Sequence, residues 1–192
     1  MRVSRAKAAE NRERVIAAAG ALFREKGFGG VSVADVMKAA DLTHGGFYGQ
    51  FGSKDDLVAQ ACRKASAEAA DNWQRTAARA PDEAYAALLL RYLRPSHRDE
   101  PGRGCIFAAL GADAARSGAA VQRAFADGVE PLIDLLAQSA PGASKAARRR
   151  KGVAAMAGLV GALLLARAVG KGELSDEILE ATRRELLAAG GR

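Results

Sequence analysis

Cys105 and its neighbours are the first residues whose types and spacing favour a reaction. Cys105 follows Gly104 at the expected start of a helix, with Arg103 beside it and His97 and Arg98 in the same segment. A helix N-terminus and nearby cations both lower the pKa of a thiol and so raise its reactivity. Cys105 is therefore a candidate sensor thiol. The alternative is a small buried side chain, because cysteine is among the most buried residue types.

The other cysteine and the histidines give little support for catalysis or metal binding. The chain has 2 Cys and 2 His, so a zinc site would need nearly all of them from scattered positions. Cys62, within an expected helix, is interpreted as a core residue. The motifs GxSxG, HExxH and GxxxxGK do not occur in the sequence. We expect a protein that is not an enzyme and that uses no metal and no cofactor.

A second unusual group is the stretch THGGFYGQFGSK at residues 43–54, with four glycines and three aromatic residues. Phe47 and Phe51 are four residues apart, so on a short helix both face the core. Tyr48 is rotated away from them, so its hydroxyl can reach a polar group of a partner. Glycines at positions 45 and 46 let such a partner approach the backbone closely, at a cost of about 1 kcal/mol of helix propensity each.

Two consecutive helices would position this stretch. Ser32 followed by Asp35 is a capping-box pattern that opens a helix at 33–40. Asp41 and Leu42 break it, and a short helix is expected at 44–50. Helices joined by so short a turn form a helix-turn-helix, whose second helix enters the major groove of DNA. By spacing alone, a glycine-rich hairpin between ordinary core helices remains the alternative.

The pattern of residues 8–58 resembles the DNA-binding domain of the TetR/AcrR family of bacterial transcriptional regulators. Its most specific part is the combination GFY-x-x-F-x-SK-x-x-L, which runs from Gly46 to Leu57. Two positions depart from the family pattern. Asp41 stands where the family often has glycine, but aspartate tolerates the left-handed conformation, so we expect the turn to survive. Gly49 replaces a larger residue, which removes one contact with DNA.

The resemblance implies which residues face DNA. They lie at the start of the second helix, around the recognition helix and at the start of the following helix: Ser32, Val33, Thr43, His44, Gly45, Tyr48, Gln50 and Lys54. His44 and Gln50 are the favoured base readers, since both side chains offer donors and acceptors. Tyr48 and Lys54 are expected to contact phosphates and so to position the protein on DNA.

The whole chain shows helical spacing of apolar residues and no sustained strand-like alternation. We expect an all-α protein of about nine helices. A three-helix, helix-turn-helix DNA-binding domain at 1–53 precedes a larger helical ligand-binding and dimerisation bundle at 54–192. The expected helices are 8–26, 33–40, 44–50, 54–79, 81–94, 105–116, 119–139, 144–169 and 176–189. Segment 95–104 holds two prolines and two glycines and is expected to be a loop.

The last two helices are expected to form a homodimer interface. One short recognition helix reads few base pairs, and two copies on a palindrome solve this. The expected contact residues are Val153, Met156, Val160, Leu163, Leu164, Ile178, Leu179 and Leu186. Alternatively, the apolar run at 153–166 is only the core helix of the protomer. The apolar run at 153–166 is shorter than the roughly 20 residues that a membrane span needs, so we expect no membrane association.

The resemblance also implies a small-molecule effector in the C-terminal bundle. The candidate lining residues are aromatic, with a core role as the alternative: Trp73, Tyr85, Tyr92, Phe107 and Phe125. A Gly-Cys pair near position 105 also resembles family members that sense electrophiles or oxidants. The formal net charge of +7 suits a polyanionic partner, although the excess is spread evenly along the chain.

Together these features predict a cytoplasmic TetR-type regulator, a repressor that a ligand releases from a double-stranded DNA operator. An activator would have the same sequence features. The runner-up is a helical small-molecule-binding or interaction protein without a DNA role. Such a carrier has no reason to keep Tyr48 and Lys54 exposed beside a glycine-weakened helix.

Overall fold

The computed structural model describes residues 5–190, which form helices and connecting turns with no strand in that range. This confirms the expected all-α class. The α-helices are α1 (Arg5–Lys26), α2 (Val33–Ala39), α3 (Lys54–Arg79), α4 (Ala84–Tyr92), α5 (Pro95–Asp99), α6 (Ile106–Ala115), α7 (Ala119–Ser139), α8 (Lys145–Ala168) and α9 (Glu173–Gly190). Three 3-10 turns join them: η1 (His44–Gly46), η2 (Pro81–Glu83) and η3 (Pro101–Arg103).

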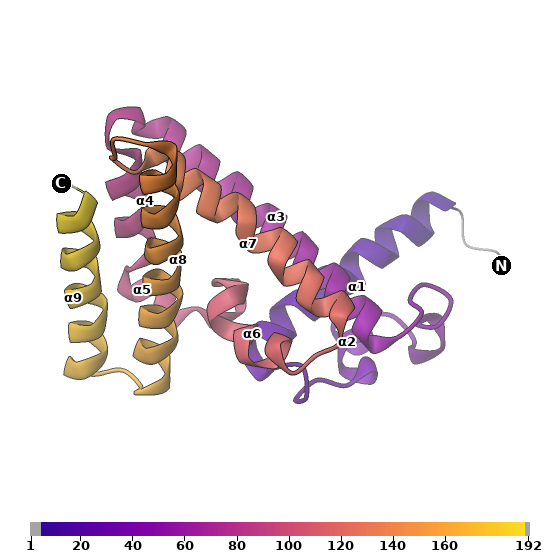
Figure 1. Ribbon diagram of the computed structural model, residues 1–192. Coiled ribbons are helices and arrows are strands. Elements are labelled where there is room, and N and C mark those ends of the chain that lie inside the picture. Colours follow the sequence, from indigo (N-terminus) through magenta and orange to yellow (C-terminus); the bar gives the residue numbers. More distant parts are fainter. Residues whose placement is uncertain (1–4, 191–192) are drawn as a thin grey trace.

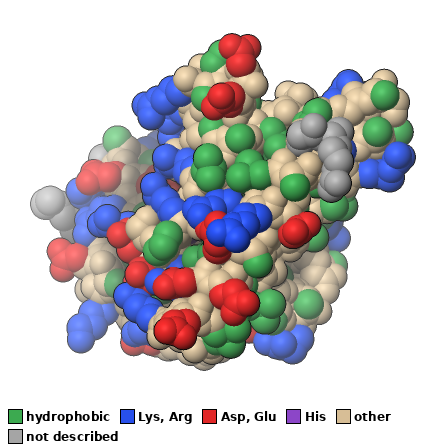
Figure 2. All heavy atoms as spheres, turned by 90° about the vertical axis from the view of Figure 1, so that its left-hand side faces the viewer, with side chains coloured by type: hydrophobic (Ala, Val, Ile, Leu, Met, Phe, Trp, Pro, Cys, Tyr) green, Lys and Arg blue, Asp and Glu red, His purple; other side chains and the backbone are tan. Residues whose placement is uncertain are grey.

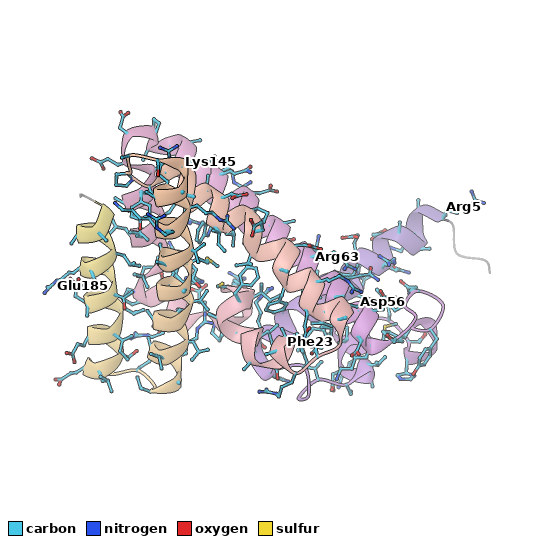
Figure 3. The ribbon with its side chains drawn as sticks, viewed as in Figure 1. Arg5, Phe23, Asp56, Arg63, Lys145 and Glu185 are labelled. Carbon is cyan, nitrogen blue, oxygen red and sulfur yellow. The ribbon has the colours of Figure 1, made fainter. Side chains whose placement is uncertain are left out.

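The long helix α3 connects the two ends of the molecule (Figure 1). Its first turns pack against α1, and further along it packs against α7 and α4. Figure 3 shows Phe23 of α1 within the N-terminal part, whereas Lys145, at the start of α8, lies at the far end of the bundle. A division of the chain into domains at 53/54 stays a prediction, and α3 begins at that point.

The N-terminal part is held together by large side chains that exclude water. Phe23, Met37, Phe47 and Leu57 come from four different segments, and each is at most 1 % exposed. Phe47 and Phe51 stack with 5.3 Å between ring centroids, as their spacing predicts. Burying such a side chain contributes about 1.5–3 kcal/mol, so this cluster fixes the helix-turn-helix on α1.

The turn after α2 has the conformation expected from Asp41. This residue has φ 56°, the left-handed region that aspartate tolerates. The turn is closed by the Leu42 amide, which donates to the Met37 carbonyl at 2.9 Å. At the other end of α2, the reciprocal Ser32–Asp35 capping box is present. The sequence therefore predicted both ends of α2 correctly.

The short helix expected at 44–50 is shorter than predicted and is not an α-helix. The chain makes a single 3-10 turn at His44–Gly46, and non-helical turns carry it to Phe51. Three glycines within six residues explain this, because each costs about 1 kcal/mol in a helix and a short helix has few hydrogen bonds to offset that cost. Phe47 and Phe51 still reach the core, since an amide–carbonyl hydrogen bond of 3.0 Å joins these two residues.

The C-terminal bundle is built on α7, which packs along α3 on one side and α8 on the other. Gly152 of α8 permits the close approach of α8 to α7, because a Cβ there would lie 2.8 Å from the Ile133 carbonyl oxygen and 2.9 Å from the Ala137 nitrogen. By length and composition α8 passes as a membrane span. It packs between α7 and α9, however, as the core helix of a bundle does.

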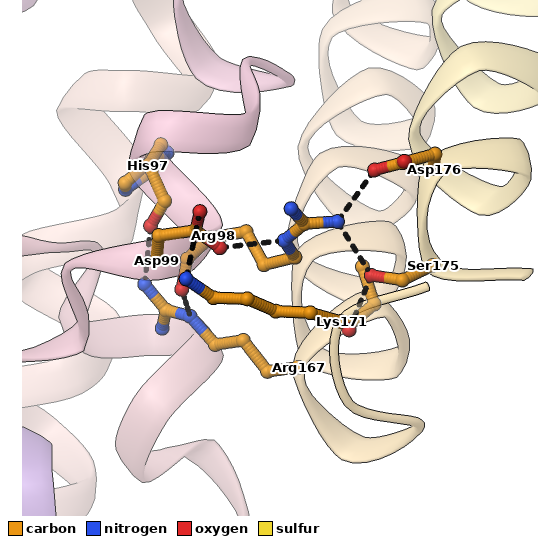
Figure 4. A network of polar contacts seen from close by, with 8 residues as sticks. His97, Arg98, Asp99, Arg167, Lys171, Ser175 and Asp176 are labelled. Atoms are coloured by element: carbon orange, nitrogen blue, oxygen red, sulfur yellow. Dashed lines mark hydrogen bonds and ion pairs between the residues drawn. The ribbon is translucent and has the colours of Figure 1, made fainter. Parts of the chain in front are cut away.

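Segment 95–104 is not the loop that its prolines and glycines suggested. It forms α5 and η3, each with a proline in its first turn, where the missing amide proton costs nothing. Figure 4 shows how α5 is anchored to the junction of α8 and α9. The nearly buried Arg98 donates to Asp99 at 2.7 Å, Ser175 at 2.9 Å and Asp176 at 2.6 Å. Arg167 donates to the His97 carbonyl at 2.7 Å.

Candidate functional site

The turn that follows α2 presents a polar surface over a buried aromatic base. Thr43, His44 and Gly45 are exposed, and Tyr48 is 70 % exposed although Phe47 beside it is fully buried. The Tyr48 ring packs edge-on against Phe47 at 5.1 Å and lies 6.4 Å from the His44 ring. These contacts orient the Tyr48 ring while its hydroxyl faces solvent.

Gln50 does not project freely in this structure. Its side-chain nitrogen donates to the Gly46 carbonyl at 3.1 Å, and its side-chain oxygen is buried with no hydrogen-bond partner. To read a base, the Gln50 amide would have to leave its own turn. His44 is exposed, and no side-chain hydrogen bond holds it among the described residues. Of the two expected base readers, only His44 is ready for contact without rearrangement.

Residues at the starts of α2 and α3 lie at the edges of the same surface. Ser32 is exposed and Val33 half-buried at the N-terminus of α2. Lys54 opens α3, but its ammonium group donates to the Phe28 carbonyl at 2.6 Å. An ammonium group has three donors, so two remain for another acceptor. The helix-turn-helix thus brings the predicted residues together, with Gln50 and Lys54 partly committed to internal contacts.

A cavity of about 290 Å³ lies in the C-terminal bundle, between α3, α4 and the segment around η3. Trp73, Tyr92, His97 and Cys105 line it. The rings of Trp73 and Tyr92 meet edge to face at 5.8 Å, and Tyr92 packs against His97 at 4.6 Å. Two of the expected aromatic residues therefore meet at one cavity together with the candidate thiol.

The remaining aromatic candidates lie elsewhere. Phe107 and Phe125 pack against each other with 5.5 Å between centroids, and neither lines this cavity. Tyr85 lines a different hollow, beside Leu187 of α9. Sequence reasoning could not separate core from lining aromatics, because both kinds occupy buried helix positions. It also missed three arginines of the lining, which resemble any solvated charge in the sequence: Arg24, Arg91 and Arg94. It named the fourth, Arg103, only as a neighbour of Cys105.

Cys105 occupies the N-cap position of α6, as expected. Burial raises the pKa of Cys105, and the neighbouring Tyr92 hydroxyl and the first amides of α6 only partly oppose this. The cations that favour the thiolate are Arg167 and Arg24 rather than Arg103 or Arg98. Arg98 is engaged by carboxylates instead. The expected lowering of the Cys105 pKa is therefore wrong, because loss of solvation outweighs the helix N-terminus and the cations.

His97 holds the Cys105 backbone in place. Its Nε2 accepts from the Cys105 amide at 3.0 Å, and its Nδ1 lies 2.8 Å from the Tyr92 carbonyl. Since Nε2 accepts, Nδ1 carries the proton and the ring is neutral. Burial lowers the pKa of His97, and Arg167 and Arg94 lower it further. His97 is thus a neutral residue of the cavity lining, held in place by hydrogen bonds at both ring nitrogens.

The α8 surface carries an apolar stripe that the protomer leaves uncovered. Val153 and Leu164 are 44 % and 39 % exposed, and a Cβ on Gly161 would meet no atom within 4 Å. These residues follow one face of the helix. Leu165 and Leu174, which are also exposed, extend the surface toward α9. Figure 2 shows the side of the molecule that carries α9, where hydrophobic side chains lie among basic and acidic ones.

The expected dimer residues divide into three groups, and the exposed Val153 and Leu164 are the first. Met156, Leu163 and Leu179 are at most 3 % exposed, because they face the core of their own protomer, so they cannot belong to an exposed face. Val160, Ile178 and Leu186 are half-buried and pack against that core. The helical period alone did not reveal which side of α8 the bundle covers. The apolar run thus serves the core on one side and remains open on the other.

The described chain is all-helical and carries a helix-turn-helix at its N-terminal end, an arrangement that binds DNA. Residues 15–61 match the sequence profile of the bacterial regulatory proteins, tetR family. The chain carries the N-terminal domain of this family, which confirms the resemblance seen in the sequence. No curated protein matches the chain.

Solved structures share the fold across the whole chain. The reduced form of NemR from E. coli is 21% identical with a TM-score of 0.77, covering 92% of this chain and 95% of that one. A TetR-family regulator from Agrobacterium tumefaciens is 20% identical with a TM-score of 0.78, covering 94% and 97%. FadR from Bacillus subtilis, solved in complex with stearoyl-CoA, is 10% identical with a TM-score of 0.71, covering 92% and 98%. At sequence identities this low, the similarity to these structures shows a shared fold and nothing more.

Proposed function

We propose that this protein is a TetR-type repressor, which binds a palindromic operator as a homodimer and is released by a small-molecule effector. The observation that carries the proposal is the turn after α2, where a 70 % exposed Tyr48 stands on a fully buried Phe47. A tyrosine held in place with its hydroxyl in solvent suits a contact with a phosphate oxygen. A helical carrier without a DNA role gains nothing from this arrangement.

The residues proposed to face DNA are those of the sequence prediction. Thr43, His44 and Gly45 are exposed on one turn with Tyr48, which supports a shared contact surface. Gln50 joins them if its amide leaves the Gly46 carbonyl. At the edges, the phosphate contacts proposed are from Ser32 and Val33 at the N-terminus of α2 and from Lys54 at the start of α3.

Dimerisation is proposed through the uncovered stripe of α8 and the adjoining face of α9. A two-fold contact requires a self-complementary surface, and apolar side chains flanking Gly161 and its small neighbours allow two helices to approach closely. In the proposed dimer the two α8–α9 pairs form a four-helix contact, and each protomer contributes one helix-turn-helix to the operator.

The effector site proposed is the cavity lined by Trp73, Tyr92 and Cys105. FadR is a structural neighbour solved with an acyl-CoA, and NemR is one described in a reduced form. Two routes to release follow for this chain, namely reversible binding in the cavity and modification of Cys105. The raised pKa of Cys105 favours the first route, whereas its place in the cavity lining keeps it accessible to a reagent that enters.

The test is a gel shift with DNA from upstream of the protein's own gene, run for wild type and Cys105→Ser, each with and without a thiol-reactive electrophile. A shift competed by the same DNA and not by unrelated DNA supports the regulator. Loss of the shift after treatment, in the wild type alone, supports sensing through Cys105. An equal shift with every DNA contradicts a sequence-specific regulator.

A further inference from the structure

The cavity near Cys105 has a strongly cationic lining. Four arginines contribute to it, from α1, from the end of α4 and the residues after it, and from η3: Arg24, Arg91, Arg94 and Arg103. The one acidic residue in the lining, Glu68, lies 3.3 Å from Lys64 and is thus already engaged by a cation. Cations therefore outnumber carboxylates four to one around a space that a ligand can enter.

None of these four arginines forms an ion pair within the part of the chain that the structure describes. Arg24 donates to the Gly102 carbonyl at 2.7 Å, and Arg91 donates to the Asn72 side-chain oxygen at 2.9 Å. Both acceptors are neutral. They satisfy one donor each but do not compensate the charge, and a guanidinium group has five donors.

The surroundings disfavour the positive charges of Arg91 and Arg24. Burial lowers the pKa of Arg91, and Arg94, Arg79 and Arg75 lower it further. Burial also lowers the pKa of Arg24, against an opposing effect of Glu68. A lowered arginine pKa means that the surroundings disfavour its charged form. An anion in the cavity would supply the missing compensation.

The rest of the lining and the cavity volume indicate what kind of molecule could accompany the anionic group of a ligand. Trp73, Tyr92 and Leu132 contribute apolar surface to the cavity lining. The volume of about 290 Å³ lies at the lower end of the roughly 300–1,000 Å³ typical of small-molecule pockets. Guanidinium groups bind carboxylates through paired, charge-assisted hydrogen bonds.

We propose that this cavity binds a small organic carboxylate, with Arg24 and Arg91 holding the carboxylate and the apolar surface contacting its hydrocarbon body. The proposal rests on the proposed function, because it names the chemical class of the effector. A long acyl chain or a neutral drug-like molecule is a worse match, since the first exceeds the space and the second leaves the arginines uncompensated.

Arg24 gives this site a direct connection to the DNA-binding part. It belongs to α1, which packs against α3 and α2 beneath the helix-turn-helix. Its bond to Gly102 ties α1 to η3, and the Phe28 amide ties the end of α1 to Asp113 of α6. A carboxylate that accepts from the remaining donors of Arg24 shares this guanidinium group with the Gly102 carbonyl. Binding would therefore act on the side chain that joins α1 to η3.

The chain provides its own reporter for a binding test, because Trp73 is its single tryptophan and lines the cavity. The test titrates the protein with 3-phenylpropionate, with its neutral analogue 3-phenylpropionamide, and with inorganic phosphate, following Trp73 fluorescence. The carboxylate should bind at least about tenfold more tightly than the amide, which corresponds to about 1.4 kcal/mol. Binding of the amide at equal or higher affinity overturns the proposal, as does failure of the carboxylate to saturate below about 10 mM.

Inorganic phosphate separates an organic ligand from an anion site. If phosphate binds as tightly as 3-phenylpropionate, the apolar surface contributes nothing and the proposed ligand class is wrong. The expected result is competition by phosphate only at concentrations at least about tenfold higher.

Matched arginine variants locate the site. Arg24→Gln and Arg91→Gln should each reduce the preference for carboxylate over amide to about threefold or less. Arg123→Gln, on the exposed surface of α7, is the control and should leave the preference unchanged. Melting followed by circular dichroism checks folding, and Arg94→Gln, an exposed residue at the cavity, replaces either variant that does not fold. An unchanged preference in all folded cavity variants overturns the assignment.

The ligand class and the DNA-binding proposal can fail separately. The fluorescence titration contains no DNA, so carboxylate binding without sequence-specific DNA binding would retain the ligand class and reject the regulator. Specific DNA binding without carboxylate binding would reject the ligand class and retain the regulator.

Discussion

Tyr48 combines an exposed side chain with a ring held by aromatic neighbours. Tyr48→Phe keeps the packing on Phe47 and removes only the hydroxyl. If that hydroxyl donates to a phosphate, the substitution should weaken DNA binding by about 1.5–3 kcal/mol, as for other hydrogen bonds to charged groups. Fluorescence anisotropy with operator DNA measures this.

Tyr85→Phe provides the matched control, because Tyr85 lies at the other end of the molecule beside α9. It should leave DNA affinity unchanged. An equal affinity for wild type and Tyr48→Phe would mean that the ring packs without touching DNA.

Cys105 gives a prediction with a defined direction in pH. Burial raises its pKa above the ordinary 9.0, so the thiolate fraction at neutral pH is smaller than in a free thiol. Alkylation of Cys105 by iodoacetamide should therefore be slower than that of glutathione at pH 7 and should accelerate until well above pH 9.0. Mass spectrometry separates it from Cys62, whose pKa burial raises to about 12.

The same shifts affect stability. Both thiols keep their protons longer in the folded chain than in the unfolded one. The free energy of unfolding should therefore fall as pH rises above 9.0, the ordinary thiol value.

For the alkylation prediction, a reaction of Cys105 with iodoacetamide that is faster than that of glutathione at pH 7 would contradict the raised pKa of its thiol.

Among the helices, the contact between α7 and α8 depends on a single glycine. Gly152→Ala places a Cβ 2.8 Å from the Ile133 carbonyl oxygen, so the helices must separate. We expect a loss of about 1–3 kcal/mol of unfolding free energy, typical of overpacked cores. Chemical denaturation measures it. Gly111→Ala on α6, where an added Cβ would meet no atom within 4 Å, is the control and should be neutral or stabilising, because alanine favours helix by about 1 kcal/mol. Equal effects of the two substitutions would contradict this account of the α7–α8 contact.

Short-range features of the elements were predictable and long-range ones were not. The Ser32–Asp35 capping box and the Asp41 turn depend on neighbouring residues, and the sequence predicted both. The sequence did not predict the 3-10 turn at 44–46 or the helix at 95–99. The reason is that glycine destabilises a helix interior, whereas proline is accepted in the first turn of a helix. The cationic cavity was missed for another reason, since Arg24 of α1 and Arg91 of α4 are far apart in the sequence and line one cavity only in the folded chain.

For the whole molecule, the proposed dimer predicts a change in mass after one substitution. Gly161 lies near the centre of the uncovered stripe of α8, and a Cβ added at this glycine would meet no atom within 4 Å. Gly161→Arg should therefore leave the protomer folded but place a charge in the proposed interface. Sedimentation at about micromolar concentration should show a dimer for the wild type and a monomer for this variant.

Ala78→Arg, an exposed substitution on α3, should remain dimeric. A wild-type protein that sediments as a monomer under these conditions would reject the α8–α9 interface, as would a dimer unaffected by Gly161→Arg.

Sequence-specific DNA binding by a symmetric dimer is best examined by selection from random duplex DNA. After several rounds, the retained sequences should share an inverted repeat whose half-sites are separated by about one helical turn of DNA, 10–10.5 base pairs, or a multiple of it. Two helix-turn-helix units related by a two-fold axis require that symmetry. Retained sequences with no shared motif, or with one unrepeated motif, would contradict a dimeric operator-binding regulator.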